Sequence, residues 1–255
     1  MLVVISPAKR LDWSDAPGLR QTKPRMLEEA NALARRMKRQ SGPDLMALMD
    51  ISKDLAALNR KRFTEFSDDP AAGDTRPAMR AFAGDTYQGL DAASLDEDAV
   101  RWADDHLRIL SGLYGLLRPR DAIQPYRLEM GTRLATNRGK SLYDWWEDRI
   151  ALHLNRDAES AGTRLLVNCA SQEYFTAADR DALDLDVVTP VFLEDKPGGP
   201  KMVSFYAKKA RGAMARFIVE HRLTDADQLR AFDLGGYAYQ ADLSEPGKPA
   251  FLRAD

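Results

Sequence analysis

Short, uninterrupted apolar runs separated by helical segments are the feature that most constrains the fold of this chain. One run, Leu-Val-Val-Ile at residues 2–5, ends at Ser6-Pro7, and residues 164–169 contain a second. Continuous apolar runs rich in β-branched residues are typical of strands that are buried on both faces of a sheet. Further strands are predicted at 107–111, 187–192 and 202–205. The runs therefore predict a sheet whose central strands lie in the protein interior.

Segments with helix start and stop signals lie between these runs. Residues 24–40 begin with a proline and are followed directly by Ser41-Gly42-Pro43, and both features favour a helix of that length. Ser141 and Asp144 have the spacing of a capping box for a helix to about Arg156. Other helices are predicted at 43–50, 52–66, 94–106 and 206–222. The alternation predicts one α/β domain over residues 1–255, with α+β as the alternative, in which helices surround a central mixed sheet.

The charges are segregated along the chain although they nearly cancel. The formal net charge is −2 at pH 7, which excludes a uniformly basic surface but does not exclude nucleic acid as a partner. Seven basic residues against two acidic ones occur at 20–40 and again at 108–140, and seven against one at 196–222. These three basic segments predict a basic cleft if they meet in space, and solvated surfaces if they do not.

Polar loops follow three of the predicted strands, at residues 6–10, 112–132 and 168–175. In open α/β sheets, ligands bind beyond the carboxyl ends of the strands, where such loops meet. Each notable side chain also has an ordinary structural interpretation: a surface ion pair for Lys9, a helix cap for Glu173 and a core aromatic for Tyr114. Arg127 and Glu129 share one face of an extended segment, so we expect them to pair.

The Gly112-Leu-Tyr-Gly115 turn is similar to the glycine turn of helix–hairpin–helix modules, whose backbone N–H groups approach a DNA phosphate. Here one extra residue separates the glycines, and a strand rather than a helix is predicted upstream. Arg118 and Arg120 follow the turn and would add positive charge beside it.

Several classes of protein lack support in this sequence. The single cysteine, Cys169, excludes an intramolecular disulfide framework and a multi-thiolate metal site, and the three histidines show no metal-ligand spacing. Walker, GxGxxG, GxSxG and HExxH motifs are missing from the sequence. The first apolar run is too short for a signal peptide, and no 18-residue apolar run occurs. We therefore expect a soluble, cytoplasmic protein with no membrane association, no metal and no cofactor.

The polar loops and the last basic segment together carry a resemblance that spans nearly the full chain. The motifs are Ile5-Ser-Pro-Ala-Lys9, Leu110-Ser-Gly-Leu-Tyr-Gly-Leu-Leu-Arg-Pro119, Gln124-Pro-Tyr-Arg-Leu-Glu-Met-Gly131, Glu173-Tyr-Phe175 and Ser204-Phe-Tyr-Ala-Lys-Lys-Ala-Arg-Gly212. In these motifs the chain resembles the YaaA family of bacterial peroxide-stress proteins. The resemblance implies a role in tolerating hydrogen peroxide by limiting free iron and iron-driven DNA damage. It also implies DNA binding through a basic cleft, on a family-specific fold, with no established reaction.

The leading hypothesis is a DNA-binding protein that recognises duplex or structured DNA without strong sequence preference and needs no obligate protein partner. Phosphate contacts of this kind position a protein on DNA but read no sequence. The candidate DNA-binding residues are Lys9, Arg10, Gly112, Gly115, Arg118, Arg120, Arg127, Lys196, Lys201, Lys208, Lys209, Arg211 and Arg216.

The alternative hypothesis is an enzyme that acts on a nucleotide or nucleobase in a crevice at the strand ends. Glu129 or Glu173 would then be the general acid or base, with Tyr114 or Tyr126 stacked on a base and Lys9 and Arg127 on phosphate. Direct iron binding is disfavoured because the sequence has no clustered His or Cys ligands.

The last long helix, from about Tyr206, carries most of the third basic segment. The spacing of Ala210, Met214, Phe217 and His221 predicts that this face packs on the core. Gly212 lies inside the helix, where it costs up to ~1 kcal/mol relative to alanine. A helix tolerates that cost where another backbone, or a DNA phosphate, comes close.

Overall fold

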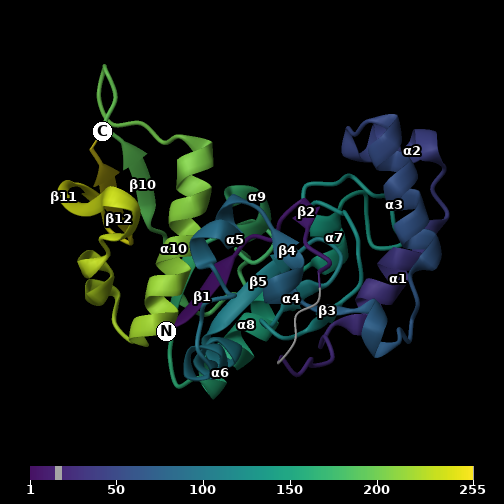
Figure 1. The fold of residues 1–255 in the computed structure, drawn as a ribbon, viewed down its shortest axis with the longest axis horizontal. Helices are drawn as coiled ribbons and strands as arrows, with labels where there is room; N and C mark the ends of the chain where they lie inside the picture. Colours follow the sequence, from purple (N-terminus) through teal and green to yellow (C-terminus); the bar gives the residue numbers. More distant parts are fainter. Residues whose placement is uncertain (15–18, 255) are drawn as a thin grey trace.

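A mixed five-stranded sheet lies at the centre of the computed structural model, which describes residues 1–14 and 19–254 (Figure 1). The strand order is β6-β5-β1-β8-β9. Strands β5, β1, β8 and β9 are parallel, and β6 returns antiparallel along β5. The bounds are β1 (Leu2–Ile5), β5 (Leu107–Ser111), β6 (Gly115–Leu117), β8 (Leu165–Cys169) and β9 (Asp186–Val188). The predicted α/β fold with a central mixed sheet is confirmed.

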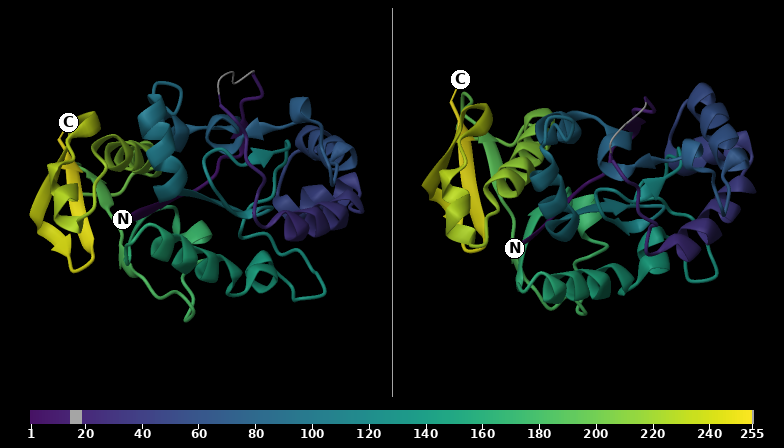
Figure 2. Two further views of the ribbon diagram at one scale, coloured as in Figure 1. Left: turned by 90° about the horizontal axis from the view of Figure 1, so that it is seen from below. Right: turned by 60° about the horizontal axis from the view of Figure 1, so that its bottom comes forward.

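The apolar runs form the middle of this sheet because helices cover both of its faces. Every residue of β1 and of β5 is buried. Helices α5 (Asp85–Leu90) and α10 (Ser204–His221) lie on one side of β1, and α8 (Arg149–Ser160) lies on the other (Figure 2, left). Ile150, Ala151 and Leu154 form the buried stripe of α8.

Two smaller units flank the central sheet (Figure 1). A helical unit at one end contains α1 (Leu27–Lys38), α2 (Gly42–Met49) and α3 (Lys53–Glu65). A three-stranded sheet at the other end has the order β10-β12-β11, with β10 (Val191–Glu194), β11 (Tyr237–Glu245) and β12 (Lys248–Arg253). Two side-chain caps begin the helices of the first unit: Ser41 accepts from Asp44 N, and Ser52 accepts from Leu55 N.

Short elements connect these units. Two-residue strands pair β2 with β4 and β3 with β7. These strands are β2 (Arg10–Leu11), β3 (Arg76–Pro77), β4 (Phe82–Ala83) and β7 (Ala122–Ile123). The remaining helices are α4 (Ala78–Ala81), α6 (Glu97–His106), α7 (Leu142–Trp146) and α9 (Gln172–Phe175), with 3-10 turns at Ala72–Asp74, Ala226–Ala231 and Leu234–Gly236.

Helices α5 and α10 approach each other unusually closely at two glycines. A Cβ atom on Gly212 would lie 1.8 Å from the carbonyl oxygen of Thr86, and one on Gly89 would lie 2.0 Å from that of Lys209. Gly212 therefore makes room for the backbone of α5. Of the two close partners expected for this glycine, another backbone or a DNA phosphate, the structure contains the backbone.

Several predicted boundaries differ from the structure. The helix predicted at 141–156 has the expected Ser141 capping box but breaks at Glu147, whose φ of 47° is left-handed, so α7 and α8 are separate. The strand predicted at 202–205 is wrong, because α10 already begins at Ser204. Asp96 rather than Ser94 caps α6 by accepting from Ala99 N. His221 is exposed, so of the four positions predicted to face the core only Ala210, Met214 and Phe217 are buried, and the buried part of α10 ends at Val219.

Candidate functional site

The loops that follow β1 and β8 meet where the strand order of the sheet changes direction. The chain leaves β1 toward β5 on one side and later crosses to β8 on the other. Such a switch point leaves a crevice at the carboxyl ends of the strands. Ser171 N donates a hydrogen bond to Ser6 Oγ at 2.9 Å, which joins the two loops. The Tyr87 hydroxyl of α5 donates to the Ser6 carbonyl at 3.2 Å and fixes the first loop.

A pocket of about 480 Å³ lies at this switch point. The loops after β1 and β8 form its walls together with α5 and the first turns of α10. Its charged lining residues are the basic Lys9, Arg10, Lys208 and Arg211 and the acidic Asp85 and Glu173. Basic side chains thus exceed acidic ones by two. We call this the switch-point pocket.

Glu129 brings the second polar loop to the edge of the pocket. Lys9 Nζ lies 2.6 Å from Glu129 Oε2, and Arg127 donates to Glu129 Oε1 at 3.1 Å. The expected pairing of Arg127 with Glu129 is therefore present, and Lys9 takes the surface ion pair that was its structural interpretation. The side chain of Lys9 is 63% exposed, whereas that of Glu129 is 20% exposed and also accepts a hydrogen bond from Arg127. Lys9 is therefore accessible from the pocket, and another anion would compete with Glu129 for it.

Arg211 is the most buried cation of the pocket. Its side chain is half-buried, and within residues 1–14 and 19–254 no carboxylate lies within ion-pairing distance of it. Burial lowers the pKa of the guanidinium, and the nearby Cys169 thiol opposes this effect. Arginine nevertheless stays protonated in proteins, so the pocket contains a half-buried positive charge without a carboxylate partner.

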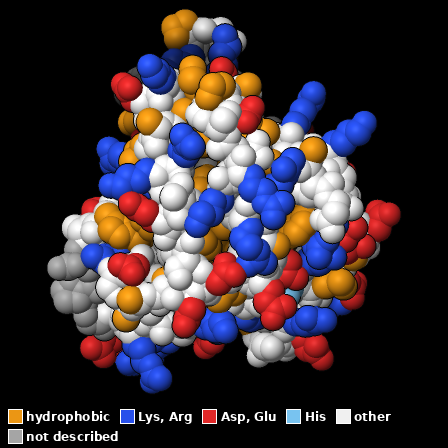
Figure 3. All heavy atoms as spheres, turned by 90° about the vertical axis from the view of Figure 1, so that its right-hand side faces the viewer, with side chains coloured by type: hydrophobic (Ala, Val, Ile, Leu, Met, Phe, Trp, Pro, Cys, Tyr) orange, Lys and Arg blue, Asp and Glu red, His pale blue; other side chains and the backbone are white. Residues whose placement is uncertain are grey.

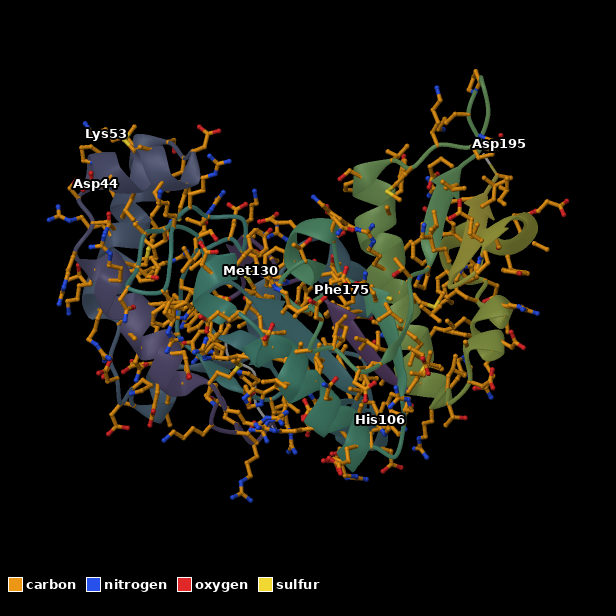
Figure 4. The ribbon with its side chains drawn as sticks, turned by 180° about the vertical axis from the view of Figure 1, so that it is seen from behind. Asp44, Lys53, His106, Met130, Phe175 and Asp195 are labelled. Atoms are coloured by element: carbon orange, nitrogen blue, oxygen red, sulfur yellow. The ribbon has the colours of Figure 1, made fainter. Side chains whose placement is uncertain are left out.

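The remaining residues of the second and third polar loops are largely interior. Met130 and Phe175 lie near the middle of the molecule (Figure 4). Helices α2 and α3, which Asp44 and Lys53 mark, lie on one side of them, and the loop that begins at Asp195 lies on the other. Both side chains are buried. Glu173, two residues before Phe175, is exposed at the pocket and accepts a hydrogen bond from Gly131 N at 3.0 Å.

Three candidate arginines have structural partners outside the pocket. Arg118 donates to Asp121 at 2.8 Å and to the carbonyl of Lys23. Arg120 forms an ion pair with Asp104. Arg216 pairs with Glu220 and Asp91. These guanidinium groups are matched by carboxylates of the fold, so a phosphate would have to compete with an existing ion pair at each of them.

The first basic segment does not reach the switch-point pocket either. It includes α1, which lies at the opposite end of the molecule from α10 in every ribbon view (Figures 1 and 2). Lys and Arg side chains gather over the middle of that end of the molecule, with acidic side chains mostly below them (Figure 3). Arg35 there pairs with Asp68. The three basic segments therefore do not share one pocket.

The other candidate lysines surround α10. Lys208 lines the switch-point pocket, whereas Lys209 lines a separate pocket of about 330 Å³ next to Arg216. Lys196 and Lys201 lie on the loop between β10 and α10, where Lys201 is exposed and its backbone pairs with Glu194. Lys208 and Lys209 therefore line different pockets from neighbouring positions of α10, and Lys201 lies on the loop that precedes the helix.

Gly112 and Gly115 are in the protein interior, contrary to the expectation that their backbone approaches a phosphate. They form the turn between antiparallel strands β5 and β6, so no helix–hairpin–helix unit is present at this turn. Gly112 O accepts from Trp146 Nε1 at 3.1 Å, and a Cβ atom on Gly115 would lie 2.8 Å from the Trp146 ring. Gly115 is needed for packing against Trp146, whereas a Cβ atom on Gly112 would lie 2.2 Å from the carbonyl oxygen of Leu128.

Tyr114 and Tyr126 belong to the core rather than to a base-stacking site. The Tyr114 hydroxyl accepts from Gln124 N at 3.0 Å, and the Tyr126 hydroxyl lies 2.6 Å from Ser111 Oγ. Burial raises the pKa of both phenols far above the usual value. They therefore remain neutral and hydrogen-bonded inside the protein, as the structural interpretation of Tyr114 anticipated.

Asp85, Thr86 and Gln88 of α5 line the pocket but were not among the candidates. Their sequence neighbourhood has no motif, and α5 reaches the pocket because it packs on α10. The paired small residues Gly89 and Gly212 are the sequence signal that could have placed α5 beside α10.

We predict that Cys169 does not react with peroxide or thiol reagents in the folded protein. The side chain is 1% exposed, and burial raises the pKa of the thiol to about 12 despite the nearby Arg211. Because the thiolate is the reactive form, labelling with Ellman's reagent at pH 8 should be negligible until denaturant unfolds the chain. Rapid labelling of the native protein would contradict this prediction.

The fold and the pocket define an α/β protein with a basic site at the switch point of a parallel sheet. Residues 1–243 match the family model described as peroxide stress protein YaaA. The chain is 62% identical over 253 residues to a UPF0246 protein of Ruegeria pomeroyi, covering 99% of this chain and 98% of the relative. It is 58% identical over 258 residues to a UPF0246 protein of Cereibacter sphaeroides, covering 100% of both. The chain therefore belongs to the YaaA family of peroxide stress proteins, as its motifs predicted.

The residues that the structure describes contain neither a candidate membrane span nor a cluster of metal ligands. No helix among them has the length and apolar character needed to span a bilayer. Nor do three or more His, Cys, Asp or Glu side chains among them gather in an arrangement that could hold a metal ion.

Proposed function

We propose that this peroxide-stress protein binds the sugar–phosphate backbone of DNA and thereby helps to limit iron-driven DNA damage. The observation that carries the proposal is a group of basic side chains in the lining of the switch-point pocket: within residues 1–14 and 19–254, Arg10, Lys208 and Arg211 form no ion pair with a carboxylate. Lys209 and Lys201 are also exposed. Backbone phosphates are the natural counter-anions of such a surface.

The proposed contact region is narrower than the sequence suggested. It consists of the loop after β1 and the first half of α10, with Arg127 held at its edge through Glu129. Because contacts of this type read no bases, binding should depend on DNA shape and salt more than on sequence.

The test is a salt titration of DNA binding by fluorescence anisotropy with wild-type protein and the double variant Lys208→Glu, Arg211→Glu. Reversing the two charges should weaken binding by roughly tenfold or more and reduce the slope of log affinity against log salt by roughly two. A thermal melt close to that of wild type shows that the variant is folded.

The matched control reverses two lysines of α3, Lys53→Glu with Lys61→Glu, at the opposite end of the molecule. Both double variants change the net charge equally, so only the α10 variant should lose binding. A flat salt dependence, or equal losses in the two variants, removes the proposal.

A second candidate function is suggested by the carboxylate at the pocket. Glu173 lies among the basic side chains and is oriented by the hydrogen bond from Gly131 N. A carboxylate held beside a cationic pocket could act as the general acid or base on a bound nucleotide. Loss of nucleotide turnover in Glu173→Gln, with retained nucleotide binding, would distinguish this enzyme from a binding protein.

A further inference from the structure

We propose that the switch-point pocket binds a phosphate monoester carried on a sugar, either a free mononucleotide or the phosphorylated end of a DNA strand. This goes beyond binding to the DNA backbone, since it assigns a ligand to the interior of the pocket rather than to the surface around it.

Arg211 is a charge in the pocket lining for which the described part of the protein supplies no side-chain partner. Arg108, Arg118 and Arg120 each contact a carboxylate of the fold, and the half-buried Arg80, Arg138 and Arg180 donate to backbone carbonyls. Arg62 also has no carboxylate partner in the described residues, but it does not line the switch-point pocket. Arg211 is half-buried and has no carboxylate partner in the described residues. A partly buried charge is costly unless it is paired, so the missing partner is expected to be an anion that enters the pocket.

The charge of the pocket lining fits a phosphate monoester. Lys9, Arg10, Lys208 and Arg211 face Asp85 and Glu173, which leaves two positive charges in excess. A phosphate monoester carries about −1.5 to −2 charge at pH 7 and matches this excess. An internal phosphodiester carries a single negative charge and matches it less well.

The size and composition of the pocket fit a sugar next to that phosphate. Its volume of about 480 Å³ lies in the range of roughly 300–1,000 Å³ that small-molecule sites occupy, and it exceeds the space that a bare phosphate needs. The carboxylates of Asp85 and Glu173 are hydrogen-bond acceptors, which suits the hydroxyl groups of a sugar next to the phosphate.

The position of the pocket supports the same ligand. It lies at the carboxyl ends of β1 and β8, at the switch point of the parallel sheet. This is the place where open α/β sheets bind phosphorylated ligands. The loop after β1 and the residues of α10 therefore play the parts of phosphate-binding elements, although neither contains a known phosphate-binding motif.

The test is isothermal titration calorimetry of the full chain with inorganic phosphate, AMP and adenosine. We expect AMP to bind and adenosine not to bind. Arg211→Gln should weaken AMP binding by about tenfold or more, because a hydrogen-bonded charge pair is lost. Lys208→Gln, at an exposed position, should weaken it too and serves as the second variant if Arg211→Gln does not fold.

The matched control is Arg164→Gln, just before β8 and so at the opposite end of that strand, where Arg164 makes an exposed pair with Asp184. It should bind AMP as the wild type does. A single-stranded oligonucleotide with a 5′ phosphate, compared with the same oligonucleotide with a 5′ hydroxyl, distinguishes the two sources. Tighter binding of the 5′-phosphorylated strand than of the 5′-hydroxyl strand identifies a DNA end, and AMP binding with equal binding of the two strands identifies a free nucleotide.

The proposal is overturned if AMP does not bind at millimolar concentration and the 5′-phosphorylated strand binds no more tightly than the 5′-hydroxyl strand, or if Arg211→Gln binds AMP as tightly as wild type. Binding to a covalently closed circular duplex, which has no ends, is measured in parallel. Retained circle binding with no phosphate monoester binding overturns this inference and leaves the proposed DNA-binding function intact.

Discussion

Asp157→Ala should lower the free energy of unfolding by about 3–5 kcal/mol, the usual cost of removing one partner from a buried ion pair. The Asp157 carboxylate on α8 accepts from Arg108 Nε at 2.6 Å and from Arg25 Nη2 at 2.9 Å. The side chains of Arg108 and Asp157 are 4% and 5% exposed. Removing the carboxylate leaves the Arg108 guanidinium charged and buried in β5 without its anion. Denaturant unfolding monitored by tryptophan fluorescence measures the loss.

The control for this prediction is Asp184→Ala. Asp184 pairs with Arg164, and both side chains are more than half exposed. An exposed pair contributes about 0–1 kcal/mol, so this variant should unfold almost as the wild type does. Equal losses of unfolding free energy in the two variants would show that the buried pair stabilises the fold no more than the exposed pair does.

The same carboxylate makes part of the stability depend on pH. Burial raises the pKa of Asp157, but the hydrogen bonds and charges of Arg25 and Arg108 outweigh burial and hold the pKa below its usual value. The ionised carboxylate therefore stabilises the fold above the unfolded-state pKa of about 3.9. This contribution is lost as the pH falls through the lower folded-state pKa. The difference in unfolding free energy between wild type and Asp157→Ala should be constant near neutral pH and shrink in acid.

The elements that the sequence predicted well are those whose pattern is local. Residues 2–5 and 107–111 became β1 and β5 with the predicted bounds. A continuous apolar run predicts the first strand, and the alternating pattern of Leu107-Arg-Ile-Leu-Ser111 predicts the second. The capping box at Ser141 also follows from a local pattern, since it needs only Asp144 three residues later. The break at Glu147 depends on how α7 and α8 pack, which no local pattern records.

The sequence predicted which loops meet at the candidate site, but it did not predict which side chains are unpaired there. The loop after β1, the loop after β8 and the start of α10 do meet, as the rule for strand ends predicts. Arg120 was a plausible phosphate contact until the fold placed it on Asp104, sixteen residues earlier and on a different element. Whether an arginine is free or matched is decided by tertiary neighbours, and the sequence carries no local sign of it. The same holds for Gly115, whose neighbour Trp146 lies far along the chain.

Gly212→Ala should destabilise the protein by about 3 kcal/mol or more, at the upper end of the usual cost of overpacking. The added Cβ atom would lie 1.8 Å from the carbonyl oxygen of Thr86 and 2.9 Å from the backbone nitrogen of Leu90. Both atoms belong to the backbone of α5, so neither can move without moving the helix. The helix propensity of alanine returns at most ~1 kcal/mol, which is too little to offset the separation of α5 from α10.

The control is Gly42→Ala at the first position of α2, where an added Cβ atom meets nothing within 4 Å. This variant should stay within about 1 kcal/mol of the wild type, because the gain in helix propensity is offset by the restriction that Pro43 places on the residue before it. Thermal and denaturant unfolding of both variants measure the difference, and a Gly212→Ala variant of wild-type stability would contradict the close crossing. The crossing also sets the width of the switch-point pocket, because Thr86 and Gln88 line it from α5 while Lys208 and Arg211 line it from α10. At a temperature where Gly212→Ala remains folded, its AMP binding should therefore be weaker than that of Gly42→Ala, although neither substitution removes a charged group.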